Sequence, residues 1–126
     1  MSKQKNPSRF ESDECGATLK NFRISPQKLN LVAGLIRGKT IDIALKNLMM
    51  SRKRAAKDVE KLLMSAVSNA ETNQGLDIDE LVVRQAYVGK GMVMKRFMAK
   101  ARGRGVRIHK PFSRLNIVVG TNKGVA

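Results

Sequence analysis

The stretch KGMVMKRFMAKARGRGVRIHK, residues 90–110, decides how this chain folds. It carries eight Lys or Arg and no acid, yet Met, Phe, Val and Ile are interspersed among the charges. The flanking segments LVVRQAYVG (81–89) and PFSRLNIVVG (111–120) are β-branched and alternating, which is typical of strands. If both strands continue into the basic stretch, residues 87–107 form a long hairpin. Ten residues an arm, at about 3.3 Å each, would project roughly 30 Å. So long a ribbon is not stable alone in water, so we expect it to lie against a partner.

The uneven charge of the chain indicates what that partner is. The net charge is +15, and residues 81–126 contribute +11 of it, with 11 cations and no acid. Residues 1–80 hold 14 cations and all 10 acids, which gives +4. A field of one sign at this density is neutralised by a polyanion, and nucleic acid is the first candidate. A membrane surface would require an amphipathic helix, which the glycines of the basic stretch interrupt, and no apolar run is long enough to span a bilayer. We therefore expect no membrane partner.

The length of 126 residues allows one domain with a modest core. Residues 17–120 are predicted to form it, followed by a C-terminal tail, 121–126. Residues 1–16 have the polarity of a disordered arm. Cys15 is the only cysteine, which excludes an internal disulfide and favours a reducing compartment.

Helical patterns fill the first part of the predicted domain. A short strand over 17–24 precedes SPQKLNLVAGLIRGK, in which Ser25 is a good N-cap, Pro26 suits the first helical position, and Gly38 supplies a stop. A second, shorter helix over 41–50 follows, and its Met49-Met50 pair is expected to fill core space. The pattern predicts an α/β (α+β) fold with three helices.

The third helix is predicted over 51–71, because apolar positions keep one continuous face there. Its first turn would be Ser51-Arg52-Lys53-Arg54. Cations near a helix N-terminus oppose the macrodipole, so these three side chains were not selected to stabilise the helix. The alternatives are a solvated face and an RNA contact, and the overall charge favours the contact.

The residues give little support to an enzyme. His109 is the only histidine, and no carboxylate follows Glu80 to orient it as a general base. Cys15 directly follows Asp13 and Glu14, whose negative charges disfavour an activated cysteine nucleophile. No cysteine or histidine partners complete a metal site, and the acids of the loop near Glu80 lack an EF-hand spacing. We expect no catalytic residue, no metal, no cofactor and no small-molecule substrate.

The few aromatic residues favour phosphate contacts over base reading. With one Tyr, four Phe and no Trp, the sequence indicates no stacking platform for bases. Phe22 and Tyr87 lie in strand patterns and are expected to pack in the core. The methionines Met92, Met94 and Met98 either adapt to an irregular RNA and protein surface or pack on the sheet of a compact domain with a shorter hairpin.

Three blocks in order carry a resemblance. SPQKLNLVAGLIRGK, RKRAAKDVEKLLMSAVSNAE and MKRFMAKARGRGVRI, the last ahead of a final strand, together resemble the bacterial large-subunit ribosomal protein twenty-two family over about residues 17–119. The resemblance implies three helices on a three-stranded antiparallel sheet with a protruding hairpin. Many members carry a proline after the MKR motif, whereas Met98-Ala99-Lys100 has none, so the tip geometry is not carried over.

The resemblance also implies a function and its residues. The domain would sit on large-subunit ribosomal RNA, aid its assembly, contact neighbouring ribosomal proteins, and line the nascent-peptide exit tunnel in a cytoplasmic ribosome. An organelle-encoded origin stays open. The alternative is an architectural nucleic-acid-binding protein outside the ribosome that uses its basic β-ribbon. The candidate RNA-binding residues are Lys28, Arg37, Lys39, Arg52, Lys53, Arg54, Arg84, Lys90, Lys95, Arg96, Lys100, Arg102, Arg104, Arg107, His109, Lys110 and Arg114. The implied tunnel-lining tip comprises Met94, Lys95, Arg96, Phe97, Met98, Ala99, Lys100, Ala101, Arg102 and Gly103.

Overall fold

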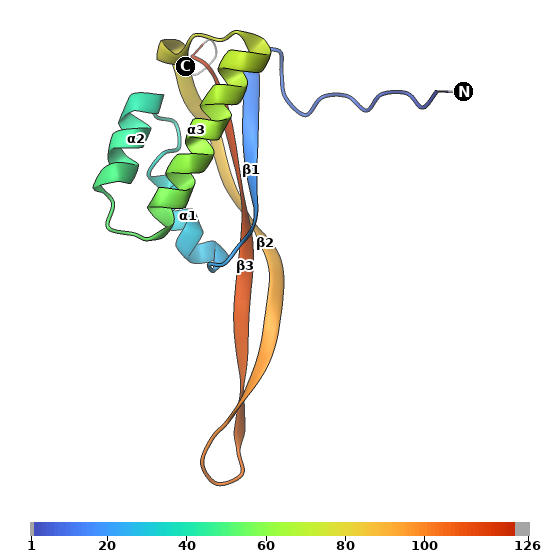
Figure 1. Cartoon of the computed structure of the whole chain (residues 1–126), viewed down its shortest axis with the longest axis vertical. Helices are drawn as coiled ribbons and strands as arrows, with labels where there is room; N and C mark the ends of the chain where they lie inside the picture. Colours follow the sequence, from blue (N-terminus) through green and yellow to red (C-terminus); the bar gives the residue numbers. More distant parts are fainter. Residues whose placement is uncertain (1, 123–126) are drawn as a thin grey trace.

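The computed structural model describes residues 2–122, which form three helices and a three-stranded antiparallel sheet (Figure 1). The predicted α+β fold is confirmed. The elements are β1 (Glu14–Phe22), α1 (Pro26–Gly34), α2 (Ile41–Met50), α3 (Ala55–Gln74), a short 3-10 helix η1 (Ile78–Glu80), β2 (Leu81–Ala99) and β3 (Gly105–Thr121). Residues 123–126 of the predicted tail lie outside the described part, and Thr121 still belongs to β3.

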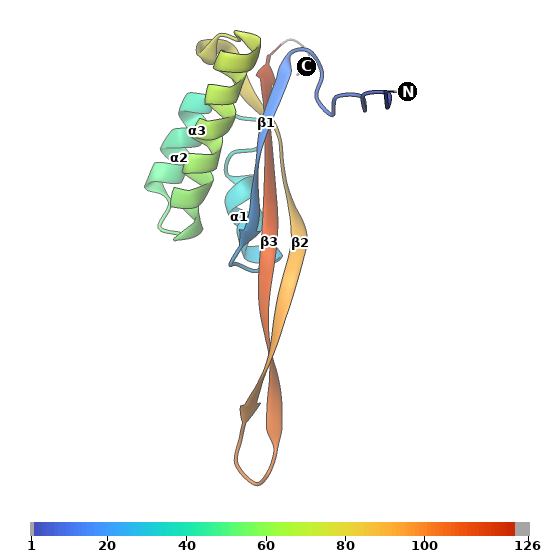
Figure 2. The same cartoon turned by 45° about the vertical axis from the view of Figure 1, so that its right-hand side comes forward.

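The sheet has the order β1-β3-β2, so the strand nearest the C-terminus is central. Pairs such as Cys15↔Val119 join β1 to β3, and pairs such as Val88↔Leu115 join β2 to β3. All three helices lie on one face of this sheet (Figure 2). Helix α3 packs on β1 and β3, α1 packs on β2, and α2 packs on α3. The other face of the sheet carries no helix among the described residues.

The core lies between the helices and the inner face of the sheet. Apolar residues at helical spacing on α3 meet alternate residues of the strands, as the two periodicities predict. Removing this area from water supplies the main favourable term for folding. The largest fully buried apolar side chains are Leu29, Val32, Ile36, Leu48, Val59, Leu63, Leu81, Val83, Leu115, Ile117 and Val119.

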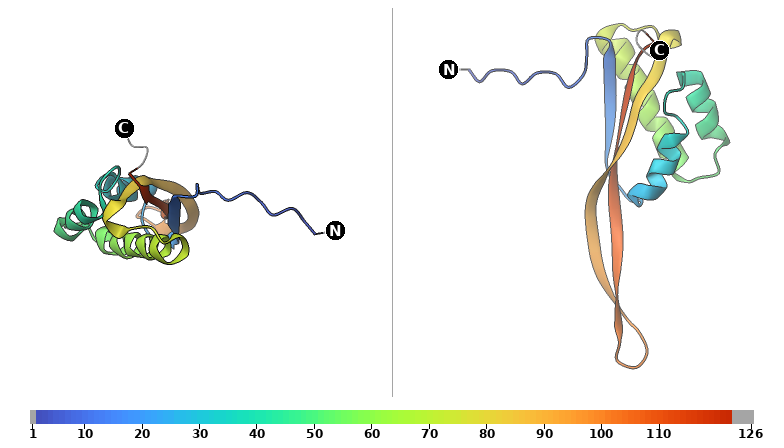
Figure 3. Two further views of the ribbon diagram at one scale, coloured as in Figure 1. Left: turned by 90° about the horizontal axis from the view of Figure 1, so that it is seen from above. Right: turned by 180° about the vertical axis from the view of Figure 1, so that it is seen from behind.

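The hairpin arms are direct continuations of β2 and β3 beyond the end of β1, and they project as a twisted ribbon (Figure 3, right). Pairing continues to Ala99↔Gly105, so the strands predicted over 81–89 and 111–120 do extend into the basic stretch and form the long hairpin expected over about 87–107. The tip closes with an Arg104 N–H bond to the Ala101 carbonyl. Arg102 and Gly103 between them have φ of 61° and 67°, as the central residues of a type I′ hairpin turn require. A projecting ribbon excludes the compact alternative in which the hairpin methionines pack on the sheet.

A β-bulge decides which side chains of β2 face the core. Between Val83↔Val119 and Gln85↔Val118, strand β2 has one extra residue, Arg84. Such an insertion reverses the inward and outward faces of the residues that follow. Ala86 is therefore buried, and Tyr87, which simple alternation from Val83 would have placed inward, is 51% exposed. The predicted core position of Tyr87 was wrong, whereas Phe22 packs against the core as expected.

The start of β1 and the end of α1 differ from the prediction because distant backbone partners determine them. Strand β1 begins at Glu14, so the boundary at Ala17, and the inclusion of residues 14–16 in a disordered arm, were wrong. Helix α1 ends at Gly34 instead of reaching Gly38. The Gly38 N–H bonds the carbonyl of Val83, and the Val83 N–H bonds the carbonyl of Lys39, so pairing with the edge of β2 replaces the last helical turn.

Helix α3 begins at Ala55 and not at Ser51, and it continues to Gln74, where Gly75 adopts a φ of 62°. The Ser51 hydroxyl accepts the Lys53 N–H at 3.3 Å, which holds the short linker that leads into the helix. Arg52, Lys53 and Arg54 therefore precede the helix, so their charges do not occupy its first turn. The neighbouring Met49 and Met50 are 70% and 84% exposed, so the expectation that they fill the core was wrong.

Candidate nucleic-acid interface

Cations from four separate segments line three neighbouring hollows at the end of the domain from which the hairpin projects (Figure 1). The first hollow lies at Lys28 and the hairpin base, the second lies beside the start of α3, and the third lies along the linker that precedes α3. Arg23 lines both the first and the second, and Arg54 lines both the second and the third, so we treat the three as one groove. We call it the basic groove. Its basic residues are Arg23, Lys28, Arg52, Lys53, Arg54, Lys57, His109 and Lys110.

Local structure brings these cations together. The Ser25 Oγ accepts the Lys28 N–H at 3.4 Å and caps α1, so Lys28 lies in the first turn beside the positive end of the helix dipole. The turn between β1 and α1 presents Arg23, and the hairpin register places His109 and Lys110 in the same hollow. Because all these groups attract anions, this end of the domain favours phosphate.

Two acids also line the basic groove, Asp58 in the second hollow and Glu60 in the third. Seven Lys or Arg residues line the same three hollows, and all of them except Lys110 are exposed. The net charge of the groove is therefore strongly positive. Sequence reasoning missed Arg23 and Lys57. Only the tertiary fold brings Arg23 near the hairpin base, but the charge run 52–57 could have indicated Lys57.

The other predicted cations lie either on the ribbon or on the domain, where Arg114 is exposed on β3. Both sets come from the same charge-rich sequence, but their surroundings differ. The ribbon cations are exposed along the two arms and the tip: Lys90, Lys95, Arg96, Lys100, Arg102, Arg104 and Arg107. Lys39 is exposed after α1, and Arg37 donates to the Ala86 carbonyl at 2.6 Å and to Asn30 Oδ1, which ties α1 to β2.

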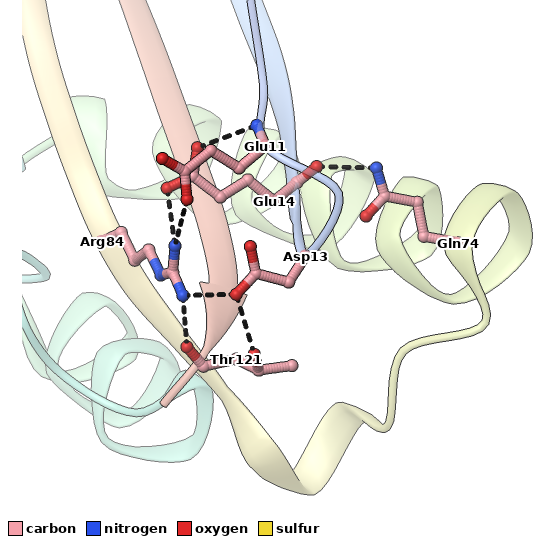
Figure 4. A network of polar contacts seen from close by, with 6 residues as sticks. All are labelled: Glu11, Asp13, Glu14, Gln74, Arg84 and Thr121. Carbon is pink, nitrogen blue, oxygen red and sulfur yellow. Dashed lines mark hydrogen bonds and ion pairs between the residues drawn. The ribbon is translucent and has the colours of Figure 1, made fainter. Parts of the chain in front are cut away.

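Arg84 lies in an intramolecular network at the far end of the sheet (Figure 4). Its guanidinium donates to Glu14 Oε1 at 2.8 Å, to Asp13 Oδ2 at 2.7 Å and to the Thr121 carbonyl at 2.8 Å. Glu11 adds an ion pair at 3.8 Å. The side chain is 14% exposed and its charge is already neutralised by carboxylates. We therefore assign Arg84 to joining β1, β2 and β3, and remove it from the RNA-binding set.

The network makes the stability of the fold sensitive to acid. Partial desolvation acts to raise the pKa of Asp13, but the hydrogen bond and charge of Arg84 outweigh it, so the pKa is lowered below its usual 3.8. A lowered pKa in the folded state contributes stability above the unfolded pKa, and this contribution is lost as the pH falls through the folded value.

We expect Arg84→Gln to lower stability near neutral pH by about 1–2 kcal/mol, because charge-assisted hydrogen bonds are lost at a partly screened site. The difference in Tm between wild type and variant should narrow as the pH falls below about 4 and through the lowered folded-state pKa of Asp13 in the wild type, because the protonated carboxyl no longer pairs with Arg84. Thermal unfolding followed by circular dichroism across this range checks it, with Lys61→Gln as the control. A difference in Tm that does not change with pH would contradict the assigned pairing.

No other chemistry is apparent in the described residues. Within 2–122, no group of three or more His, Cys, Asp or Glu is arranged to hold a metal ion. Cys15 is buried in the core and His109 is exposed on the hairpin. In the same part of the chain, no helix is both long enough and apolar enough to cross a membrane.

Comparison with known proteins gives the family. The model of the family described as ribosomal protein L22p/L17e matches residues 17–120. A protein of Maricaulis maris named large ribosomal subunit protein uL22 is 60% identical over 119 residues, which cover 94% of each chain. Proteins of the same name from Methylorubrum populi and Beijerinckia indica are 59% and 56% identical, and the second aligns with the whole of this chain and 98% of its own length. The resemblance in the sequence is thus confirmed, and the chain belongs to the ribosomal protein L22p/L17e family.

Proposed function

We propose that this protein binds folded large-subunit ribosomal RNA through the basic groove and the ribbon, aids the assembly of that RNA, and lines the nascent-peptide tunnel with its hairpin tip. Membership of the family makes it a structural constituent of the large ribosomal subunit, and its place is therefore in the ribosome. The family is one of structural proteins, and we include the absence of catalysis in the proposal. Its partners would be ribosomal RNA, neighbouring proteins and the nascent polypeptide, with no membrane.

The observation that carries this proposal is the continuity of cations from the domain onto the ribbon. His109 and Lys110 belong both to the basic groove and to β3 of the hairpin. An RNA backbone that follows the groove can thus continue along the ribbon, and its phosphates stay close to cations throughout. Such contacts fix position and register on RNA and do not read sequence. They suit recognition of a folded RNA by its shape.

The tunnel-lining part of the proposal rests on the reach and surface of the hairpin. Ten residues of β2, from Lys90 to Ala99, project about 30 Å at roughly 3.3 Å each. The tip exposes apolar side chains beside its cations: Phe97 is 72% exposed and Met98 is 46% exposed. A ribbon with this mixed surface requires a partner that offers both phosphates and apolar contact, as a wall shared by RNA and protein does.

The double variant Arg52→Ala, Arg54→Ala tests the basic groove. We expect weaker binding to protein-free large-subunit ribosomal RNA and a reduction of roughly two in the slope of log K against log salt, because each lost phosphate contact reduces it by about 0.9. Filter binding at several KCl concentrations measures both. Lys46→Ala, Lys61→Ala is a matched control, since neither lysine lines the groove. Unchanged affinity and slope in the first variant would reassign Arg52 and Arg54 to a solvated surface.

Sedimentation of cell lysates separates the proposal from an architectural role outside the ribosome. We expect the protein in the large-subunit fraction after high-salt washing. Recovery as free protein, or on the nucleoid, would favour the architectural alternative.

A further inference from the structure

The outer face of the sheet, opposite the helices, holds a small pocket that the basic groove does not include. Its volume is about 110 Å³, and it lies between the strands and the N-terminal segment. Thr18, Asn116 and Tyr87 are directly opposite one another on β1, β3 and β2, and form one row of the pocket floor. Gln85 and Val118 are opposite one another in the next row.

Two of the five aromatic residues of the chain line this pocket. Tyr87 is 51% exposed because of the bulge at Arg84, so much of its surface is uncovered. Phe10 reaches the pocket from the N-terminal segment and lies on β1, since a Cβ placed on Gly16 would come within 2.8 Å of its ring. The pocket therefore combines an uncovered aromatic side chain with a second aromatic at its edge. Such a pair of rings can stack with a planar ligand.

The polar groups in the pocket are neutral and bear both donors and acceptors. The Thr18 hydroxyl donates to Asn116 Oδ1 at 2.7 Å, which fixes the orientation of the Asn116 amide. Gln85 adds a second, exposed amide. Side-chain amides can bond both the donor and the acceptor atoms on the edge of a base, which a carboxylate or an ammonium group alone cannot do.

Two cations lie near the pocket, where the phosphates of an anionic chain could bind. Arg9 lines the pocket. Gly89 is the next residue after Tyr87 on the outer face of β2, and the Arg114 guanidinium lies over it, within 3.6–3.7 Å of a Cβ placed there. Glu14 is the one acid among the described lining residues, and it shares Arg84 with Asp13 and Glu11, so phosphates would lie away from this corner and near Arg9 and Arg114. A nucleotide would thus find cations for its phosphates beside an aromatic platform for its base.

We propose that this pocket binds one unpaired base of ribosomal RNA, stacked on Tyr87 and bonded at its edge by Gln85 or Asn116, with Arg9 and Arg114 near the flanking phosphates. The inference rests on the proposed RNA binding and adds a contact to a base, on the face of the sheet opposite the helices. Unpaired bases in folded RNA are recognised in this way, by aromatic stacking together with hydrogen bonds to the base edge.

The test compares Tyr87→Leu with Tyr87→Phe in the full chain, titrated onto protein-free large-subunit ribosomal RNA at several salt concentrations. We expect Tyr87→Leu to weaken binding about tenfold, within the range found for loss of one stacked base. The salt slope should not change, because no phosphate contact is removed. Tyr87→Phe should remain near wild type, since it keeps the ring. Thermal unfolding of both variants controls for folding, and the side chain contributes little to the core because it is half exposed.

Ultraviolet cross-linking of intact large subunits gives a second readout that does not depend on a variant. We expect mass spectrometry to find a nucleotide attached to Tyr87 or Phe10. Wild-type affinity of Tyr87→Leu together with no cross-linked base would overturn the inference and leave the proposed function standing. A cross-link from Tyr87 to a neighbouring protein would also overturn it, by showing a protein occupant. Failure of the wild-type chain to bind the RNA would overturn both.

Discussion

Deleting Met94, Lys95 and Arg96 will displace the hairpin tip while the domain stays folded and bound to RNA. The three residues pair with Lys110, His109 and Ile108 on β3, outside the helical core. No core area is lost, and two of 25 cations are removed. An odd number of residues missing from one arm inverts the inward and outward faces of that arm beyond the deletion. We therefore expect altered passage or stalling of nascent chains on subunits that still assemble.

A matched deletion separates the inversion of faces from simple shortening. Removing Arg96-Phe97 together with Arg107-Ile108 takes two residues from each arm and two cations, as in the first deletion, so the alternation is kept and the ribbon shortens by about 7 Å. We expect this control to withdraw the tip without changing the faces that it presents. Cryo-electron microscopy of subunits carrying each deletion, with a stalling-peptide assay, measures both effects. Wild-type tip density and stalling in the first deletion would assign the stretch to assembly alone.

Leu63→Ala should destabilise the protein more than Arg84→Gln does, because it opens a cavity in the core. Leu63 is fully buried on α3 in the core that faces the sheet. Truncating a buried Leu costs about 2–5 kcal/mol through lost burial and the cavity that remains, against a usual total of about 5–15 kcal/mol. Urea unfolding followed by circular dichroism gives the change in midpoint. The adjacent Met64 is 48% exposed, so Met64→Ala is the control and should change stability by less than about 1 kcal/mol. Equal midpoints for both variants would mean that this face of α3 is not packed.

The sequence predicted those features whose causes are local. Helix α2 begins and ends as its pattern indicates, and the two alternating segments around the basic stretch do form one hairpin. The ion pairs of Arg84 could not be predicted in this way. Its partners Asp13 and Glu14 lie 71 and 70 residues away, and a sequence pattern holds no information on that pairing.

The candidate sites also differ in whether their causes are local in the sequence. Charge density indicated the cations of the ribbon and the Arg52–Arg54 linker, whose contacts with RNA stay predictions. The exposure of Tyr87 depends on one extra residue in β2, and strand periodicity gives no sign of where such an insertion falls. Arg23 joins the basic groove because the tertiary fold places it with Arg54 in one hollow and with His109 in another, and neither neighbour is close to it in sequence.

The central position of β3 has a consequence for the timing of folding. Cys15 of β1 pairs with Val119 of β3. During synthesis the ribosome must add 104 more residues after Cys15 before Val119 is made. At about 5–20 residues per second, β1 waits roughly 5–20 s for its partner strand. In that interval its backbone donors and acceptors are available to other chains, which is the hazard of any unpaired strand. Helices α1 and α3 likewise lack the sheet on which they pack. Folding of the domain is therefore a late, single event in the life of the nascent chain, and a binding factor that covers β1 would act before that event.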